Sequence, residues 1–241
     1  VYEKDGAVWL KTTEFGDDKD RVLLTGDGFP TYFLADAGHY LETRQRGFGA
    51  KINFLGPDHY GYLKRIQAAA ALMGLEKSEI IVFQAVRLMK GGKEVRMSKR
   101  RGEFVTLADL FREVNPDAAR YFFLEKSADT HINFDLDLAK ERSVKNPVYY
   151  IQYAHARMAS IFRKAKSAPH TELCFDDGKL GSGRGKNLGL NLLNTREDLA
   201  LIKKLIQFPE VIEDAARDYR IHRLTRYSYE LARAFHNFYE N

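Results

Sequence analysis

The stretch that decides the fold is Lys51–Gly74, KINFLGPDHYGYLKRIQAAAALMG, which runs from an apolar segment through a turn into a helical pattern. The short segment Lys51–Leu55 is typical of a buried strand, and Tyr60–Met73 repeats apolar residues at helical spacing. Glu79–Val86 follows as the next strand candidate. Because strand, helix and strand recur within about thirty residues, the sequence predicts parallel strands joined by a crossover helix.

The residues before this stretch add further elements of the same kind. Ala7–Thr13 and Arg21–Thr25 have the composition of short strands, and Tyr32–Arg44 is apolar at helical spacing. We therefore expect residues 1–130 to form an α/β domain.

The pattern changes after the parallel strands. Helix-start signals recur, namely Thr106 with Asp109, Asn115 before Pro116, and Asn146 before Pro147. Helical spacing covers 146–166, 196–207 and 220–239, and we find no comparable strand candidate after Asn133. The sequence thus predicts an all-α domain over 131–241, with a polar, glycine-rich and flexible segment at 167–189.

Composition limits the class of protein. The chain has 241 residues, 44% of them hydrophobic and 29% charged, and no apolar run approaches the roughly 18 residues of a membrane span. Cys174 is the single cysteine, so neither an internal disulfide nor a multi-cysteine zinc site is expected. A single cysteine fits a reducing compartment, so we expect a cytoplasmic location. The seven histidines contain no His-x-x-x-His pair, and we therefore expect no protein-bound metal.

Positive charge is clustered. The net charge is +5, with basic clusters at 87–101 and 140–166 and a third at 217–233, where arginines alternate with tyrosines. Each cluster alone would also fit a solvated helix face. Three clusters with interleaved aromatic residues favour a polyanionic partner such as a nucleic acid.

The tetrapeptide Gly56-Pro-Asp-His59 directly follows the first predicted parallel strand. At the carboxyl end of such a strand, a glycine allows close approach of a ligand, and an aspartate can accept both ribose hydroxyls. The alternative is a simple helix start with Asp58 as cap.

Further along, Arg96-Met-Ser-Lys-Arg100 leaves the last predicted strand and precedes the helical region. Taken alone, it would fit a basic hairpin exit. Its position after the Gly56–His59 element makes the sequence resemble a class I aminoacyl-tRNA synthetase, in which a mobile loop of this type binds the phosphates of ATP.

Several blocks narrow this resemblance to arginyl-tRNA synthetase of bacterial type. They agree in order and spacing: Phe15–Arg21, Asp27–Asp36, Arg46–Phe48, Gly56–Gly61, Val95–Arg100, Asp117–Phe123, Phe134–Ala139 and Asn146–Ala156. The resemblance implies the second half of a Rossmann-like catalytic domain with parallel strands, followed by a helical anticodon-binding domain that is incomplete here.

It also implies an activity, in which arginine and ATP form arginyl-adenylate and the arginyl group passes to tRNA(Arg). The implied partners are arginine, ATP with accompanying Mg²⁺, and tRNA(Arg), with the enzyme acting as a monomer. The implied catalytic residues are Lys99, Arg96 and Ser98; arginine is assigned to Tyr32 and Asp36, and ATP to Gly56, Asp58, His59 and Met97. Contacts to tRNA are assigned to Tyr149, Tyr153, Arg157, Arg223 and Arg226.

Departures from the family pattern keep two alternatives open. No histidine is followed by x-Gly-His, so we expect an internal fragment that is inactive by itself, lacking the other signature of the nucleotide site. A non-catalytic tRNA-binding or regulatory paralogue is one alternative. Cysteinyl-tRNA synthetase is the other, and the isolated Cys174 argues against its zinc site.

Overall fold

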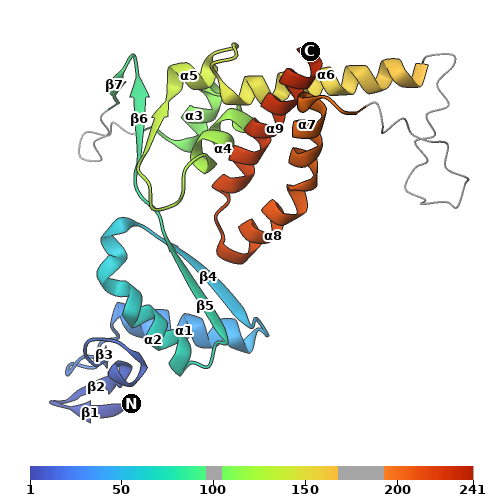
Figure 1. Cartoon of the computed structure of the whole chain (residues 1–241). Helices are drawn as coiled ribbons and strands as arrows, with labels where there is room; N and C mark the ends of the chain where they lie inside the picture. The colour runs from blue at the N-terminus through green and yellow to red at the C-terminus, as the bar shows by residue number, and fades with distance from the viewer. Residues whose placement is uncertain (96–104, 168–192, 241) are drawn as a thin grey trace, which may run out of the picture. The chain divides into compact units, whose positions relative to one another are not determined.

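The computed structural model describes residues 1–95, 105–167 and 193–240 (Figure 1). The chain forms two compact units, and most contacts between residues lie within one unit or the other. The first unit comprises Val1–Ala85 and Ala128–His131, and the second comprises Val86–Ser127 and Ile132–Asn241. The domain boundary after residue 130 stays a prediction.

The first unit begins with a small antiparallel sheet in the order β1–β2–β3. Its strands are Tyr2–Lys4, Ala7–Leu10 and Arg21–Leu24. Asp5 and Gly6 join β1 to β2 with φ of 52° and 72°, and two positive φ values suit the tight turn of a two-residue hairpin. The strand predicted over Ala7–Thr13 is too long, because the 3₁₀ helix η1 (Thr12–Phe15) replaces its end. The sequence analysis missed β1.

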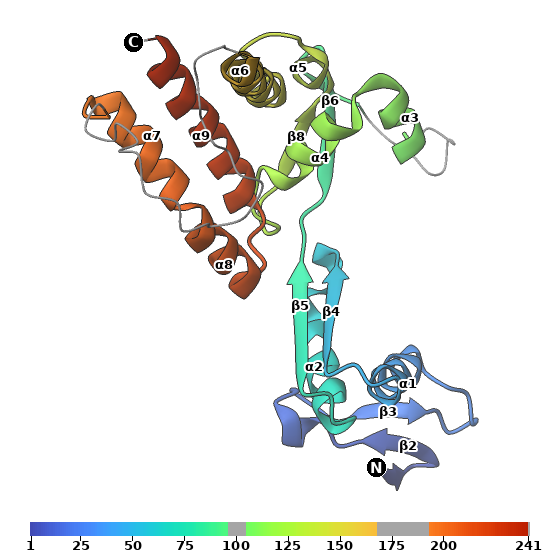
Figure 2. The same ribbon diagram turned by 90° about the vertical axis from the view of Figure 1, so that its right-hand side faces the viewer.

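Two parallel strands follow. β4 (Ala50–Leu55) pairs with β5 (Lys77–Val82) along the whole length of both strands, and Figure 2 shows their arrows pointing the same way. The crossover consists of η2 (Pro57–Tyr62) and α2 (Leu63–Leu72). The predicted strand–helix–strand unit is confirmed, although the first turn of its helix is a 3₁₀ turn.

Helix α1 (Tyr32–Gln45) lies against α2 and β3. It begins at Thr31, whose hydroxyl accepts the amide of Leu34. The core of the first unit draws apolar side chains from the sheet and from both helices: Leu10, Leu23, Phe33, Ala37, Tyr40, Ile66, Ala69, Ala70 and Leu75. This cluster holds the helices that carry the predicted ligand-binding residues.

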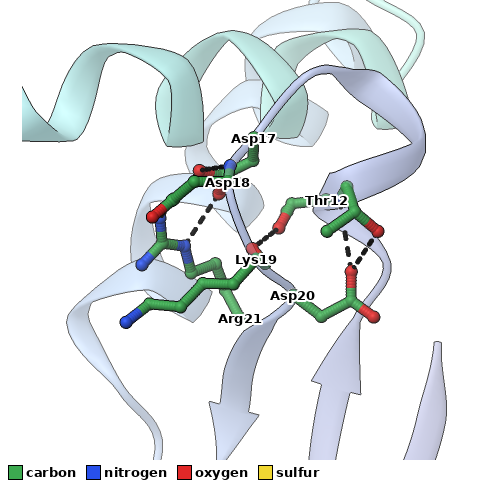
Figure 3. Close-up of polar contacts among 7 residues, drawn as sticks. Thr12, Asp17, Asp18, Lys19, Asp20 and Arg21 are labelled. Atoms are coloured by element: carbon green, nitrogen blue, oxygen red, sulfur yellow. Dashed lines mark hydrogen bonds and ion pairs between the residues drawn. The ribbon is translucent and has the colours of Figure 1, made fainter.

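A buried ion pair fixes the turn between η1 and β3 (Figure 3). Nε and Nη2 of Arg21 each donate to one carboxylate oxygen of Asp17 at 2.7 Å, and the Asp17 side chain is 1% exposed. Asp18 also pairs with Arg21, and the Thr12 hydroxyl donates to the carbonyl of Lys19 at 2.8 Å. The hydrogen bonds from Arg21 hold the pKa of Asp17 below its usual range.

The second unit contains its own sheet, in the order β7–β6–β8. β6 (Val86–Lys90) pairs antiparallel with β7 (Lys93–Glu94) and parallel with β8 (Ile132–Asp135). The strand predicted over Glu79–Val86 is correct up to Val82 and too long beyond it, since Phe83–Ala85 separates β5 from β6. β8 shows that the region after residue 131 is not purely helical; its short segment carries too weak an alternation to be recognised in isolation.

Helices make up most of the rest of the second unit. They are α3 (Leu107–Glu113), α4 (Pro116–Leu124), α5 (Leu136–Lys140), α6 (Pro147–Ser167), α7 (Arg196–Ile206), α8 (Phe208–Asp218) and α9 (His222–Glu240). The predicted capping box at Thr106 and the cap at Asn115 are confirmed. α5 and α8 were missed, and the segment predicted to be flexible lies, after Ser167, outside the described residues.

Packing in this unit forms two clusters. The larger joins the sheet to α3–α6 around Phe134, which is fully buried. The smaller joins α6 to α9 through Ala154, Ala232 and Phe235, with Leu201 of α7 packed against it. α6 thus connects the sheet-containing part of the unit to the helical part formed by α7 and α9.

Replacing Asp17 by asparagine should lower the free energy of unfolding of the first unit by about 2–4 kcal/mol, because Arg21 would keep a buried charge with one carboxylate fewer. Trp9, the only tryptophan of the chain, lies in β2. Urea unfolding followed by Trp9 fluorescence therefore reports on this unit.

The matched control is Glu14→Gln, which removes the exposed ion pair between Lys11 and Glu14 and should cost less than about 1 kcal/mol. The sign of the pH effect follows from the depressed pKa of Asp17. The stabilisation is complete above the ordinary aspartate pKa of about 3.9 and is lost as the pH falls toward the folded value, so parent and Asp17→Asn should converge in acid. Equal stability at pH 7 would contradict the role of the pair.

Candidate functional site

The end of β4 carries the predicted ATP element. Gly56 follows the last strand residue, and its carbonyl accepts the amide of His59 at 3.1 Å, which closes the first turn of η2. A Cβ atom at Gly56 would lie 2.8 Å from Oδ1 of Asp58. A side chain at this position would displace the Asp58 carboxylate from its place over the strand end, and glycine leaves that place open.

Asp58 and His59 are both exposed on η2. Nε2 of His59 lies 3.8 Å from Oδ2 of Asp58, and its ring lies edge-on to the ring of Tyr62 at 6.4 Å between centroids. Gly56, Asp58 and His59 are thus brought together, as one exposed turn with hydrogen-bonding groups available to a ligand. Their assignment to ATP stays a prediction.

The predicted arginine-binding residues lie on α1. Tyr32 is the first helical residue and is 93% exposed, whereas Asp36, one turn later, is partly buried. Oδ2 of Asp36 accepts a hydrogen bond from the Tyr62 hydroxyl at 2.8 Å. Asp36 is therefore held by a residue from η2, and its pairing with Tyr32 across a ligand stays a prediction.

Tyr62 is the residue that sequence reasoning missed. Through it, Asp36 on α1 is connected to His59 on η2. Burial, together with the hydrogen bond to Asp36, raises the pKa of Tyr62 to about 12. Only its position at the end of the Gly56–Gly61 block could have drawn attention to it, because a tyrosine before a helix is otherwise an ordinary core residue.

A cation interacts electrostatically with the same carboxylate. Lys51 of β4 sits over the Tyr40 ring at 4.2 Å from Nζ to the centroid, and the Tyr40 hydroxyl accepts from Asn53 at 2.6 Å. Burial lowers the pKa of Lys51, and the negative charge of Asp36 opposes that shift. Asp36 therefore accepts a hydrogen bond from a neutral donor and interacts electrostatically with an ammonium group.

The basic loop falls largely outside the described residues. Arg96, Met97, Ser98 and Lys99 belong to 96–104, so their roles stay predictions. The hairpin that leads to them is described: the amide of Gly91 donates to Oδ2 of Asp137 at 2.6 Å.

Aromatic side chains line one face of α6. Tyr149 and Tyr153 are spaced by one turn, and their rings stack in parallel with centroids 6.5 Å apart. The guanidinium carbon of Arg157, one turn later, lies 5.4 Å from the Tyr153 centroid and 4.1 Å from that of Tyr239 on α9. We call Tyr149, Tyr153, Arg157 and Tyr239 the α6 ladder.

The ladder rests on a buried histidine of α9. The His236 ring lies 5.5 Å from that of Tyr153 and 4.6 Å from that of Tyr150, and the residue is 5% exposed. Tyr149 and Tyr153 remain 37% and 44% exposed. The ladder therefore offers flat aromatic surface and one cation on a rigid support, which suits stacking with nucleic-acid bases.

Two other predicted tRNA residues have a different setting. Arg223 pairs with Asp214 at 3.1 Å and with Asp218 at 2.6 Å, both on α8. Arg226 pairs with Glu230 at 2.8 Å. These arginines have local carboxylate partners, so their net charge is less available to phosphates than the sequence cluster suggested.

Over residues 1–95, 105–167 and 193–240, no group of three or more His, Cys, Asp or Glu residues is arranged to hold a metal ion. In the same ranges, no helix has the length and apolar character needed to cross a membrane.

Comparison with known proteins identifies relatives of both the first unit and the mainly helical second unit. Residues 151–241 match the model of the DALR anticodon binding domain. The chain is 49% identical to an arginine–tRNA ligase of Symbiobacterium thermophilum, over 99% of this chain and 41% of the relative. It is 45% identical to that of Listeria welshimeri, over 100% of this chain and 42% of the relative. The chain thus spans about two fifths of the length of these curated relatives.

Solved structures give the same result. An arginyl-tRNA synthetase structure from Campylobacter jejuni superposes with a TM-score of 0.78 at 34% identity, over 100% of this chain and 50% of that one. The Thermus thermophilus arginyl-tRNA synthetase, with a TM-score of 0.71 and 20% identity, shows the shared fold. The chain is therefore similar along its whole length to a portion of arginyl-tRNA synthetases that includes the DALR anticodon binding domain.

Proposed function

We propose that the protein containing this chain is an arginine–tRNA ligase, which activates arginine with ATP to arginyl-adenylate and transfers the arginyl group to tRNA(Arg). The observation that carries the proposal is the 45–49% identity to arginine–tRNA ligases along essentially the whole chain. The contacts of the two units support the roles of particular residues. We further propose that the protein works in the cytoplasm as a monomer.

In this proposal, the carboxylate of Asp36 binds the guanidinium of arginine and thereby selects this amino acid. A guanidinium is planar and always charged, and it offers paired donors that one carboxylate can accept as a fork. Asp36 stands on a helix anchored in the core of the first unit, and Tyr32 is exposed one turn away on the same helix. Tyr32 would lie along one side of the bound arginine and hold its side chain in place.

ATP is assigned to the turn after β4. Asp58, folded back over Gly56, would accept the ribose hydroxyls, with His59 beside the nucleotide. From the sequence, Lys99 would stabilise charge that develops on the α-phosphate and on the leaving pyrophosphate. Arg96, Met97 and Ser98 would bind the phosphates alongside it, and Mg²⁺ would enter as the complex with ATP.

The tRNA contacts are assigned to the second unit. The tyrosines of the α6 ladder would stack on unpaired bases, and Arg157 would meet a phosphate. Arg223 and Arg226 are proposed as weaker contacts, because each already pairs with carboxylates of the protein.

The second candidate is a non-catalytic tRNA-binding or regulatory paralogue, which the match of residues 151–241 to the DALR anticodon binding domain would also fit. Arginine-dependent exchange between ATP and pyrophosphate, measured on the full-length protein with tRNA(Arg) present, separates the two. Exchange supports the ligase. Retained tRNA binding without any exchange favours the paralogue.

The arginine site is tested by Asp36→Asn in the full-length protein. The change removes the charge at nearly constant volume, so the KM for arginine should rise at least tenfold while the KM for ATP stays within about twofold. The loss of a buried charged hydrogen bond corresponds to roughly 2–5 kcal/mol. Steady-state aminoacylation kinetics measure both constants.

Glu42→Gln is the matched control. It removes one negative charge from the same helix, at an exposed position where Glu42 contacts Arg46. Its KM for arginine should stay within about twofold of that of the parent. If Asp36→Asn behaves like this control, arginine is read elsewhere.

The tRNA face is tested on the 241-residue chain itself. Arg157→Met keeps a flexible, unbranched apolar side chain but removes the guanidinium charge, so binding of tRNA(Arg) should weaken roughly fivefold or more at low salt. The slope of log K against log salt should fall by about one, as expected for one lost phosphate contact. Fluorescence anisotropy over a salt series measures both.

Arg112→Met provides the comparison, because Arg112 lies on α3 and pairs with Asp109 at 2.8 Å. It should leave the affinity and the salt slope nearly unchanged. An Arg157→Met chain with the parental slope would remove Arg157 from the tRNA interface.

A further inference from the structure

The hydroxyl of Tyr62 is placed to control one oxygen of the Asp36 carboxylate. It donates to Oδ2 at 2.8 Å, across a separation of 26 residues in the sequence. An ionised carboxylate has about four lone-pair sites on its two oxygens, so one donor at Oδ2 leaves the second site of Oδ2 and both sites of Oδ1. A guanidinium fork would use one remaining site on each oxygen.

We propose that Tyr62 is a positioning residue for arginine selection, which fixes the plane of the Asp36 carboxylate by holding Oδ2. This inference rests on the proposed function, in which Asp36 reads arginine. The chemical class recognised remains a planar, doubly donating cation. Tyr62 acts through Asp36 and makes no contact with the reacting atoms.

The position of Tyr62 is itself fixed from two sides. The guanidinium carbon of Arg65, one turn into α2, lies 4.4 Å from the centroid of the Tyr62 ring. The ring of His59 lies edge-on at 6.4 Å. The phenol therefore has little freedom to leave Asp36, since a cation and an aromatic ring hold it in place.

The protonation state suits this role. Burial and the hydrogen bond to Asp36 raise the pKa of Tyr62 to about 12, so the hydroxyl keeps its proton near neutral pH and serves as a donor. Lys51 also acts on the carboxylate, since its ammonium interacts electrostatically with Asp36. A neutral donor orients Asp36 without neutralising it, whereas an ammonium would compete with the ligand for its charge.

Two effects of the hydroxyl oppose each other. Its hydrogen bond draws some charge from the carboxylate, which weakens attraction to arginine, but it also fixes the carboxylate plane for a bidentate fork. A fork depends steeply on the angle between the two planes, and a rotating carboxylate must be ordered again at each binding event. We therefore expect the orienting effect to dominate.

The test is Tyr62→Phe in the full-length protein. The KM for arginine, and its dissociation constant from calorimetry, should both rise roughly tenfold, as expected for the loss of one charge-assisted hydrogen bond. The kcat and the KM for ATP should stay within about twofold. A comparable rise in the KM for ATP, or a fall in kcat, would indicate general damage to the fold and would overturn the proposal.

Tyr2→Phe is the matched control, because Tyr2 also donates to an aspartate, Asp20, at 2.9 Å in the same unit. It should leave the KM for arginine unchanged. A rise equal to that of Tyr62→Phe would assign the effect to stability of the unit and contradict positioning.

A double-mutant cycle separates this inference from the function on which it rests. In the Asp36→Asn background, Tyr62→Phe should change arginine affinity by less than about twofold, because its target is gone. If Asp36→Asn weakens arginine binding but Tyr62→Phe does not, the positioning role is wrong and the proposed site stands. If neither variant affects arginine binding, the proposed site itself is wrong.

Discussion

Parallel pairing of β4 with β5 is the constraint on which the candidate site depends. Neighbouring parallel strands require a crossover from the end of one strand to the start of the next. Here η2 and α2 make that crossover, and it starts at Gly56. The turn that carries Asp58 and His59 is thereby fixed at the carboxyl end of β4, where ligands of α/β sheets are usually bound. The same crossover ends its first turn at Tyr62, against α1.

The residues proposed to bind arginine are consequently in contact with those proposed to bind ATP, through Tyr62. Asp36, Tyr62, His59 and Asp58 form a continuous series of contacts from α1 to the strand end. The residues proposed for arginine and those proposed for ATP therefore share a single support. This arrangement fits a reaction that joins two substrates, because catalysis of such a step depends mainly on their relative position.

The second unit shows why positive charge in a sequence does not measure positive charge on a surface. The arginines of α9 follow acidic residues of α8, and the turn between these helices brings Arg223 against Asp214 and Asp218. Arg157 lies instead between the rings of Tyr153 and Tyr239. A guanidinium stacked on aromatic rings retains its net charge, whereas one held by carboxylates is largely compensated.

The sequence by itself determined the parallel strand–helix–strand unit and the main helix starts, because these depend on local signals such as apolar spacing, glycine turns and Thr106 or Asn115 as caps. The resemblance to arginyl-tRNA synthetases came instead from blocks of matching sequence. The sequence did not determine β8, which is a strand only because it pairs with β6 more than forty residues earlier in the chain. Nor did it determine Tyr62 as the partner of Asp36, since that hydrogen bond joins residues 26 positions apart. Tertiary structure decided these features, because pairing and side-chain orientation depend on neighbours that are distant in sequence.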